Sequence, residues 1–139
     1  MPTAREVFAR GMDLAAEGRT RDWAGLFAED GVLEFPFPPP GFTTRVVGRS
    51  EVYEHMKHLP ELLEVRFSAP LFHDTTDPDL VIAEFTSDNV AVATGREFRQ
   101  SHLAVVWFRA GEIVRYRDFW NPWVFIETLG GQDALQGQR

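Results

Sequence analysis

A single carboxylate stands among aromatic side chains near the end of the segment GEIVRYRDFWNPW, residues 111–123. Asp118 lies between Tyr116 on one side and Phe119 and Trp120 on the other. A carboxylate enclosed by aromatic rings is costly to ionise, and proteins use such groups to donate or accept protons in reactions. Asp118 is therefore our first candidate for acid–base chemistry.

The hairpin that leads into this segment predicts a partner for the carboxylate. If residues 109–111 form a three-residue loop, counting back along the two strands sets His102 directly opposite Asp118. Directly opposed side chains have Cβ atoms about 4.5–5.5 Å apart. A two-residue loop would instead place His102 opposite Phe119. We favour the longer loop because Ala110 would be strained in the type I′ turn that most two-residue loops adopt.

The favoured register also predicts which other side chains share a sheet face with this pair. Tyr116, Gln100 and Trp120 fall at alternate positions of the two strands, and thus on the face of His102 and Asp118. Tyr116 can donate a hydrogen bond to an oxyanion, which makes this face a candidate active site. A His–Asp pair across two strands also stabilises a sheet modestly without taking part in any reaction, so a structural role stays open.

The elements that must position these residues are predicted from the periodicity of apolar side chains and from turn residues. Helices are expected at residues 3–17, 20–28 and 50–59, a turn at 29–31, a strand at 32–37, and a stiff proline-rich loop at 36–42. Extended runs follow at residues 64–74, 80–94, 97–108 and 112–120, and Asn121 and Pro122 begin a last helix, with Gly130 as its C-cap. This order predicts one α+β domain over residues 1–139. Helices would cover one face of a curved antiparallel sheet and enclose a cone-shaped pocket.

Composition limits the partners and the compartment. The 139 residues carry 14 Lys and Arg against 21 Asp and Glu, a net charge of −7, which argues against nucleic acid as a partner. There is no cysteine for disulfide or thiolate chemistry. No apolar run approaches the about 20 residues that a membrane span requires, and the N-terminal segment lacks an apolar signal core. A cytoplasmic protein with no membrane partner is therefore expected.

Aromatic residues are unusually frequent, with 12 Phe and 4 Trp. A single small core rarely absorbs so many, which indicates an aromatic cavity or an apolar oligomer interface. The sheet face opposite the predicted His–Asp pair is also apolar, through Leu103, Val105, Trp107, Ile113 and Phe119. A homodimer formed through that face is expected, unless helices of the same chain cover it.

Three segments carry a family resemblance: GREFRQSHLAVVWFRAGEIVRYRDFWNPW at residues 95–123, LFAEDGVLEFP at 26–36 and GRSEVYEHM at 48–56. Their composition and order resemble the SnoaL-like branch of the nuclear-transport-factor-2-like, or ketosteroid-isomerase-like, superfamily. The resemblance spans about residues 5–130. It implies a cone-shaped α+β barrel, usually a homodimer, with a small organic ligand in the cone.

Within this superfamily, the chain looks most like the phenazine-biosynthesis A/B-like proteins. Their helix corresponding to residues 48–56 carries a pocket histidine, here His55, and their last strand ends with a catalytic glutamate, here Asp118. SnoaL-type polyketide cyclases likewise use a carboxylate as acid and base in the cone. Steroid isomerases have a base where this chain has Phe35 and a hydrogen-bonding acid where it has Ala104, so the resemblance does not imply their chemistry.

Other site chemistries fit the sequence less well. The four histidines show none of the usual metal-ligand spacings, so no metal is expected. An epoxide hydrolase of the limonene type needs an Asp-Arg-Asp set. Asp118 can be one member of such a set, but Gln100 and His102 occupy the opposing positions.

We therefore predict an acid–base enzyme that works without a cofactor as a cyclase, an isomerase or a condensing enzyme. Its substrate would be a small carbonyl-bearing metabolite of polyketide-like or aromatic character. The predicted catalytic residues are Asp118, His102 and His55. The predicted substrate-binding residues are Tyr116, Trp120, Gln100, Trp23, Phe27 and Phe35. The alternatives are a non-catalytic small-molecule-binding or scaffold protein, and an epoxide-opening cyclase or hydrolase.

Overall fold

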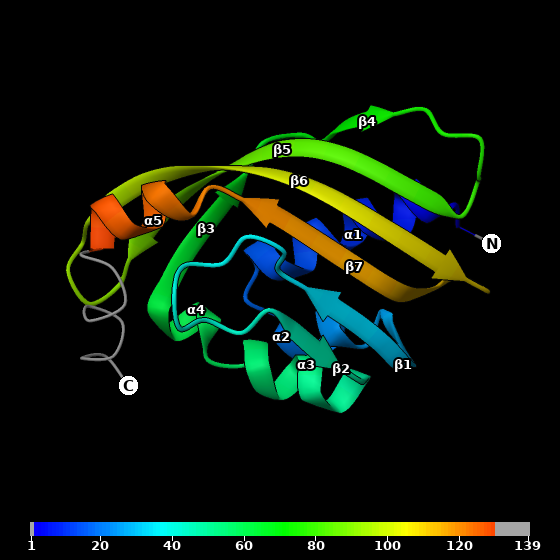
Figure 1. Ribbon diagram of the computed structural model, residues 1–139, viewed down its shortest axis with the longest axis horizontal. Coiled ribbons are helices and arrows are strands. Elements are labelled where there is room, and N and C mark those ends of the chain that lie inside the picture. Colours follow the sequence, from blue (N-terminus) through cyan, green and yellow to red (C-terminus); the bar gives the residue numbers. More distant parts are fainter. Residues whose placement is uncertain (1, 130–139) are drawn as a thin grey trace.

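The computed structural model describes residues 2–129, which form a curved sheet packed with helices (Figure 1). The helices are α1 (Ala4–Ala16), α2 (Thr20–Ala24), α3 (Arg49–Met56), α4 (Leu59–Leu62) and α5 (Pro122–Leu129). The strands are β1 (Phe27–Glu34), β2 (Arg45–Val47), β3 (Leu63–Phe67), β4 (Leu71–His73), β5 (Leu80–Ala91), β6 (Glu97–Arg109) and β7 (Glu112–Trp120). The predicted α+β class is confirmed, whereas a single domain over residues 1–139 stays a prediction.

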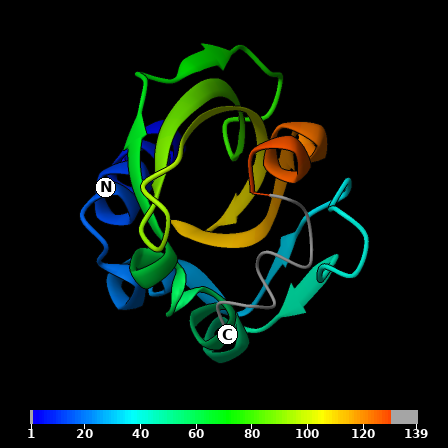
Figure 2. The ribbon, with the colours of Figure 1, turned by 90° about the vertical axis from the view of Figure 1, so that its left-hand side faces the viewer.

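The strands form one sheet in the order β2-β1-β7-β6-β5-β3, and β4 pairs with β5 on the same side as β3. Neighbouring strands are antiparallel except β1 and β7, which run parallel, so the sheet is mixed and not wholly antiparallel as predicted. Figure 2 shows the sheet curling around without closing, with β2 and β3 at its two edges. Its concave face provides the hollow that the sequence predicted.

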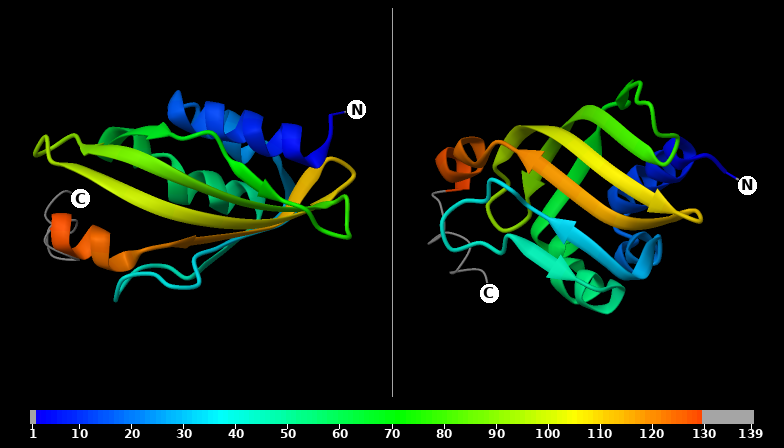
Figure 3. Two further views of the ribbon diagram at one scale, coloured as in Figure 1. Left: turned by 90° about the horizontal axis from the view of Figure 1, so that it is seen from above. Right: turned by 45° about the vertical axis from the view of Figure 1, so that its right-hand side comes forward.

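Alternation along the long strands gives the concave face its buried side chains. On β5, every second residue from Val81 to Ala91 is buried. α1 covers this face, because Phe8 packs edge-on against Phe85 with ring centroids 6.0 Å apart. The left view of Figure 3 shows α1 lying along the long strands. The N-terminal helices thus close one side of the hollow.

The boundary between the second helix and the first strand differs from the prediction. The predicted helix over residues 20–28 is wrong in its second half, because α2 ends at Ala24 and Phe27 already belongs to β1. The predicted turn at residues 29–31 lies inside β1, where the pairing with β7 shifts register between Phe27 and Val32. A bulge of this kind lets turn-forming residues lie within a strand.

The hairpin between β6 and β7 has neither of the registers considered from the sequence. Its loop is the two-residue turn Ala110–Gly111, with φ angles of 51° and 80°, so the predicted three-residue loop is wrong. A bulge at Val114 then shifts the pairing by one further residue. As a result, His102 lies opposite Trp120 and not opposite Asp118.

The observed pairing is displaced from the predicted one by two residues, an even number. His102 and Asp118 therefore still project from the same sheet face. Ile113 was predicted on the face opposite His102 and Asp118, but it is buried on the concave face. The bulge that follows it on β7 reverses the side to which Ile113 points relative to Asp118.

The last helix begins as predicted. Oδ1 of Asn121 accepts a hydrogen bond from the backbone N–H of Trp123 at 3.0 Å, and Pro122 takes the first helical position. The predicted C-cap, Gly130, lies outside the described residues. Between residues 2 and 129, no helix has the length and apolar character needed to cross a bilayer.

Candidate active site

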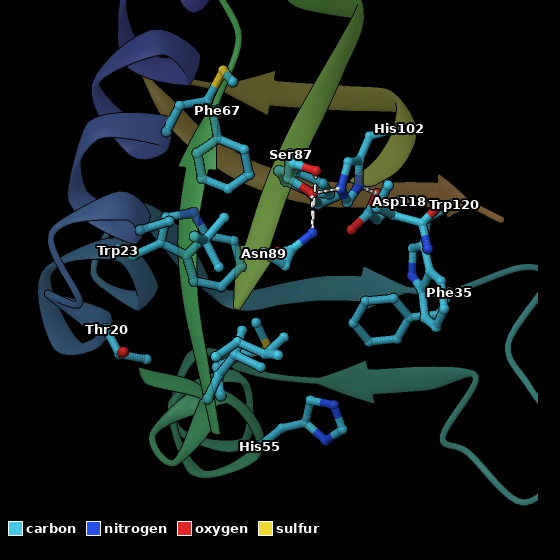
Figure 4. Close-up of a pocket in the computed structure, with 18 of the residues that line it drawn as sticks. Thr20, Trp23, Phe35, His55, Phe67, Ser87, Asn89, His102, Asp118 and Trp120 are labelled. Carbon is cyan, nitrogen blue, oxygen red and sulfur yellow. Dashed lines mark hydrogen bonds and ion pairs between the residues drawn. The ribbon is translucent and has the colours of Figure 1, made fainter. Parts of the chain in front are cut away.

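A cavity of about 810 Å³ opens between the concave face of the sheet and the helices. Its lining is mainly aromatic and aliphatic, which is typical of small-molecule sites (Figure 4). The predicted site residues that line it are Asp118, His102, His55, Tyr116, Trp120, Gln100, Trp23 and Phe35. Phe27 is fully buried behind this wall, and its ring packs on that of Trp23 with centroids 5.1 Å apart.

A chain of hydrogen bonds runs along one wall of the cavity (Figure 4). Nδ1 of His102 lies 3.2 Å from Oδ1 of Asp118, and Nε2 of the same ring lies 2.9 Å from Oγ of Ser87. Nδ2 of Asn89 donates a hydrogen bond to Oγ of Ser87 at 2.9 Å. His102 and Asp118 thus meet along a diagonal between neighbouring strands and not directly across them.

Ser87 and Asn89 are the members of this wall that the sequence interpretation missed. Both lie on β5 and are almost buried, with 2% and 5% of their surface exposed. Their signal is the alternation itself, because they continue the inward series that begins with Val81, Ala83 and Phe85. Polar side chains at inward positions of an otherwise apolar strand indicate a hydrogen-bonded network.

With a neutral imidazole, the chain has one consistent order of protons. Nδ2 of Asn89 also donates to the backbone carbonyls of Ser87 and Phe98, at 3.2 and 3.3 Å, which fixes the amide nitrogen on that side. The Ser87 hydroxyl accepts from Asn89 and therefore donates its own proton to Nε2 of His102. Nδ1 of His102 then carries the ring proton and donates it to Asp118. The network holds the carboxylate in one orientation at the cavity wall.

Packing keeps the imidazole in place. The ring of His102 stacks on that of Phe85 with centroids 4.8 Å apart and planes 6° apart, and Phe67 meets its edge at 6.4 Å. Only 14% of the His102 side-chain surface and 19% of the Asp118 side-chain surface are exposed. The pair is thus reached from the cavity but shielded from bulk solvent, which strengthens its electrostatic interaction.

Tyr116 precedes Asp118 by two residues on β7 and lines the same cavity. Its ring stacks against those of Phe8 and Phe27, with centroids 6.1 and 6.3 Å away. Burial, and to a smaller degree the charge of Asp118, raises the pKa of the Tyr116 phenol well above its ordinary value. The phenol therefore stays protonated at neutral pH and offers a hydrogen-bond donor to the cavity.

Gln100 lines the cavity, but its side-chain amide forms hydrogen bonds with backbone groups. Nε2 donates to the carbonyl of Asn121 at 2.8 Å, and Oε1 accepts from the N–H groups of Asn121 and Ser101 at 2.9 and 3.1 Å. These bonds fix the start of α5 against β6. One N–H of the Gln100 amide is left for the predicted role in substrate binding.

His55 lies across the cavity from the polar wall, on α3 (Figure 4). Its imidazole packs against Phe35 with ring centroids 5.7 Å apart, at a rim where the side chain keeps contact with solvent. Partial burial lowers the pKa of His55, so the imidazole is neutral at neutral pH. His55 and Asp118 are therefore two candidate bases on opposite walls and do not belong to one network.

Within residues 2–129, the structure brings together no three His, Cys, Asp or Glu side chains of the kind that could hold a metal ion.

Comparison with known proteins agrees with this architecture. Residues 8–116 match the profile of the SnoaL-like domain. An uncharacterized PhzA/B-like protein of Pseudomonas aeruginosa is 45% identical over 131 residues, which cover 94% of this chain and 93% of that protein. A Bacillus subtilis crystal structure, provisionally named an isomerase, has a TM-score of 0.88 at 38% identity and covers 93% of this chain and 94% of its own. A Pseudomonas putida structure, provisionally named a polyketide cyclase, shares the fold with a TM-score of 0.80 at 18% identity, over 92% of this chain and 98% of its own. The chain belongs to the SnoaL-like domain family.

Proposed function

We propose that this protein is a cofactor-independent acid–base enzyme that cyclises, isomerises or condenses a small carbonyl compound in its cavity. The observation that carries the proposal is the Asp118 carboxylate, held by His102 in a largely apolar cavity that the protonated Tyr116 also lines. Enolisation of a ketone needs a base for the proton and a hydrogen-bond donor for the oxygen. Asp118 and Tyr116 are those two groups.

In the proposed reaction, Asp118 accepts a proton from the carbon next to the substrate carbonyl. The electrons of that C–H bond move toward the carbonyl oxygen, and the Tyr116 hydroxyl donates a hydrogen bond to the enolate that forms. The enolate carbon then attacks a second carbonyl to close a ring, or it is reprotonated at another position in an isomerisation. Asp118 returns its proton to the new alkoxide or to carbon, so no co-reactant is consumed. Acid–base assistance of this kind contributes about 10²–10⁴-fold.

The two histidines have different places in this scheme. His102 occupies Oδ1 of Asp118 with its N–H and leaves Oδ2 as the oxygen that meets the substrate. His102 thereby orients the base without exchanging a proton with the substrate. His55, neutral and on the opposite wall, is the alternative base.

A polyketide-like or aromatic carbonyl compound is the substrate class that we propose. The aromatic lining and the size of the cavity support it. The names isomerase and polyketide cyclase, given to the similar Bacillus and Pseudomonas putida structures, describe reactions of this type for those proteins. At 18% identity the cyclase supports the fold alone, so the substrate class depends on the cavity of this chain.

Two other chemistries have less support in the geometry. The order Ser87, His102, Asp118 has the connectivity of a nucleophilic serine triad. The Ser87 hydroxyl is already held by Asn89, however, and its strand pairs with neighbours on both sides, so its backbone N–H groups form no oxyanion hole. Epoxide opening needs an Asp-Arg-Asp set, and the described lining does not supply one, because it contains one aspartate and no arginine.

Proton exchange tests the proposed function without knowledge of the physiological substrate. 2-Tetralone is a neutral aromatic ketone whose protons next to the carbonyl exchange with deuterated water, and NMR follows that exchange. We expect the wild-type protein to accelerate the exchange over buffer. Asp118→Asn is nearly isosteric and should lower the acceleration by about 10²-fold or more, because it removes the base.

Asp88→Asn is the matched control, because Asp88 is exposed on β5 and pairs with Arg99 outside the cavity. It should exchange 2-tetralone at the wild-type rate. If Asp118→Asn keeps the wild-type rate while His55→Ala loses it, the base lies on α3. If 2-tetralone binds and the wild type does not accelerate its exchange, the non-catalytic binding role replaces the proposed one.

A further inference from the structure

The cavity has no cationic side chain among the described residues that line it, although the chain carries 14 Lys and Arg. Its acidic lining residues are Asp118 on the polar wall and Glu61 on the exposed end of α4. Cations on the long strands project from the opposite sheet face, where Arg115 and Arg117 meet Glu34. Within residues 2–129, the site thus has no Lys or Arg side chain in its lining.

The histidines do not supply the missing charge. Partial burial lowers the pKa of His55, which leaves that ring neutral at neutral pH. Nδ1 of His102 is directed at Asp118 and its Nε2 is already hydrogen-bonded, so neither nitrogen is free to hold an anion. His58 stands at the exposed rim, with Nδ1 3.4 Å from the carboxylate of Glu61. An anionic ligand would meet the charge of Asp118, and no Lys or Arg of the described lining would compensate for it.

The polar wall also offers a specific pair of neutral contacts. All three hydrogen bonds that the Asn89 side chain makes within residues 2–129 use Nδ2, so its Oδ1 remains as an acceptor for a ligand. The protonated phenol of Tyr116 is a donor. A ligand that satisfies both contacts carries a carbonyl group together with a hydroxyl or N–H group.

We infer that the cavity selects uncharged, largely aromatic carbonyl compounds that also carry a hydroxyl or N–H group, and discriminates against carboxylates and phosphates. The inference builds on the proposed function, since it names the substrate class of the same site. An anion that enters an apolar cavity loses its hydration, and the described lining of this cavity offers it no Lys or Arg as an ion-pair partner in return. The preceding reaction must therefore deliver a substrate whose reacting part has no free acid or phosphate group.

Two nearly isosteric probes test the discrimination. 2-Naphthamide is neutral and has N–H donors, whereas 2-naphthoate carries a carboxylate on the same ring. Calorimetric titration of the wild-type protein at neutral pH should give 2-naphthamide a dissociation constant at least about 10-fold lower than that of 2-naphthoate. Equal affinities, or tighter binding of 2-naphthoate, would overturn the inference.

Asp118→Asn tests the electrostatic cause. Because the variant removes the one charge on the polar wall, it should lower the dissociation constant of 2-naphthoate by roughly 5-fold or more. The dissociation constant of 2-naphthamide should stay within about 2-fold of the wild-type value. Asp88→Asn, whose carboxylate lies outside the cavity, should change neither affinity. An unchanged 2-naphthoate affinity in Asp118→Asn contradicts the electrostatic basis.

The role of Asn89 is tested with a third probe, 2-acetonaphthone, which is neutral and has no N–H group. Asn89→Ala should weaken the binding of 2-naphthamide by about 5- to 10-fold and the binding of 2-acetonaphthone much less. The ratio of the two affinities is the readout, because the variant also removes the hydrogen bond from Asn89 to Ser87. A general loosening of the wall would weaken the binding of both probes to the same degree. A ratio equal to that of the wild type contradicts the requirement for a donor.

These binding measurements are independent of the proton-exchange assay. A preference for 2-naphthamide without accelerated exchange of 2-tetralone contradicts the proposed function and supports the inference on ligand class. Accelerated exchange together with tight binding of 2-naphthoate supports the proposed function and contradicts the inference on ligand class. The wild-type comparison also stands if a variant fails to fold.

Discussion

Asp118 and Tyr116 are suited to the proposed roles of base and hydrogen-bond donor because of what surrounds each of them on β7. They lie two residues apart and line the same cavity, yet Tyr116 is enclosed by rings while Asp118 has a hydrogen-bond donor in His102. Burial and the nearby carboxylate both disfavour the tyrosinate, so the phenol retains its proton. One group that accepts a proton and one that keeps it are the pair that enolate chemistry requires.

The titration of Tyr116 is directly measurable, because the chain has two tyrosines and Tyr53→Phe leaves Tyr116 alone. In that variant, tyrosinate absorbance should appear only well above the ordinary value of 10.0. A raised folded-state pKa gives a stability contribution that is present below pH 10.0 and lost as pH rises through the folded value. Tyr116→Phe should therefore resist alkaline unfolding better than Tyr53→Phe. A midpoint near 10.0 for Tyr116 would contradict this description of its surroundings.

At the level of elements, an irregularity in β7 brings the catalytic candidates together. With the two-residue turn alone, His102 would lie opposite Phe119 and on the other sheet face from Asp118. The bulge at Val114 adds one residue to β7 and thereby returns Asp118 to the face of His102. The bulge is thus a condition for the polar wall, and a straight hairpin of the same sequence would not form it.

This bulge also marks the limit of what the sequence predicted. Alternation and the family resemblance correctly predicted the fold class and the shared face of His102 and Asp118. The register itself was wrong, because nothing in the loop or the apolar pattern signals an extra residue at Val114. Ser87 and Asn89 were missed for a related reason, since the bond from Ser87 to His102 joins two strands and becomes visible only once their pairing is known.

The turn that accompanies the bulge contains strain that a substitution can relieve. Ala110 is exposed with a φ of 51°, a conformation that Asn tolerates better than Ala, and Asn-Gly is the preferred pair for such turns. Ala110→Asn should raise the free energy of unfolding by about 0.5–1 kcal/mol in urea denaturation. Ala93→Asn, in the exposed β5–β6 turn where φ is not positive, should bring no such gain. Equal gains at both positions would show that the backbone conformation is not the cause.

On the scale of the whole molecule, the convex face of the sheet keeps an apolar surface. Leu103 on β6 is 37% exposed, and Trp107 and Phe119 beside it are only partly buried. Arg115 lies over the ring of Trp107 and Arg117 over that of Phe119, each with its guanidinium carbon 5.1 Å from the ring centroid. Nε of Arg117 is buried and has no hydrogen-bond partner within the described residues. Such a surface is typical of an interface and not of a sheet that faces water.

We propose that this convex face joins two copies of the chain in a homodimer, because two such faces can cover the apolar side chains that each leaves exposed. Leu103→Glu places a charge on the middle strand of that face. Sedimentation velocity at micromolar concentration should therefore show a dimeric wild type and a monomeric variant, whereas Val92→Glu, on the exposed β5–β6 turn, should stay dimeric. Monomeric Leu103→Glu should still bind 2-naphthamide, because the cavity lies on the concave face and one chain supplies its described lining. A wild type that sediments only as a monomer would contradict the proposed interface.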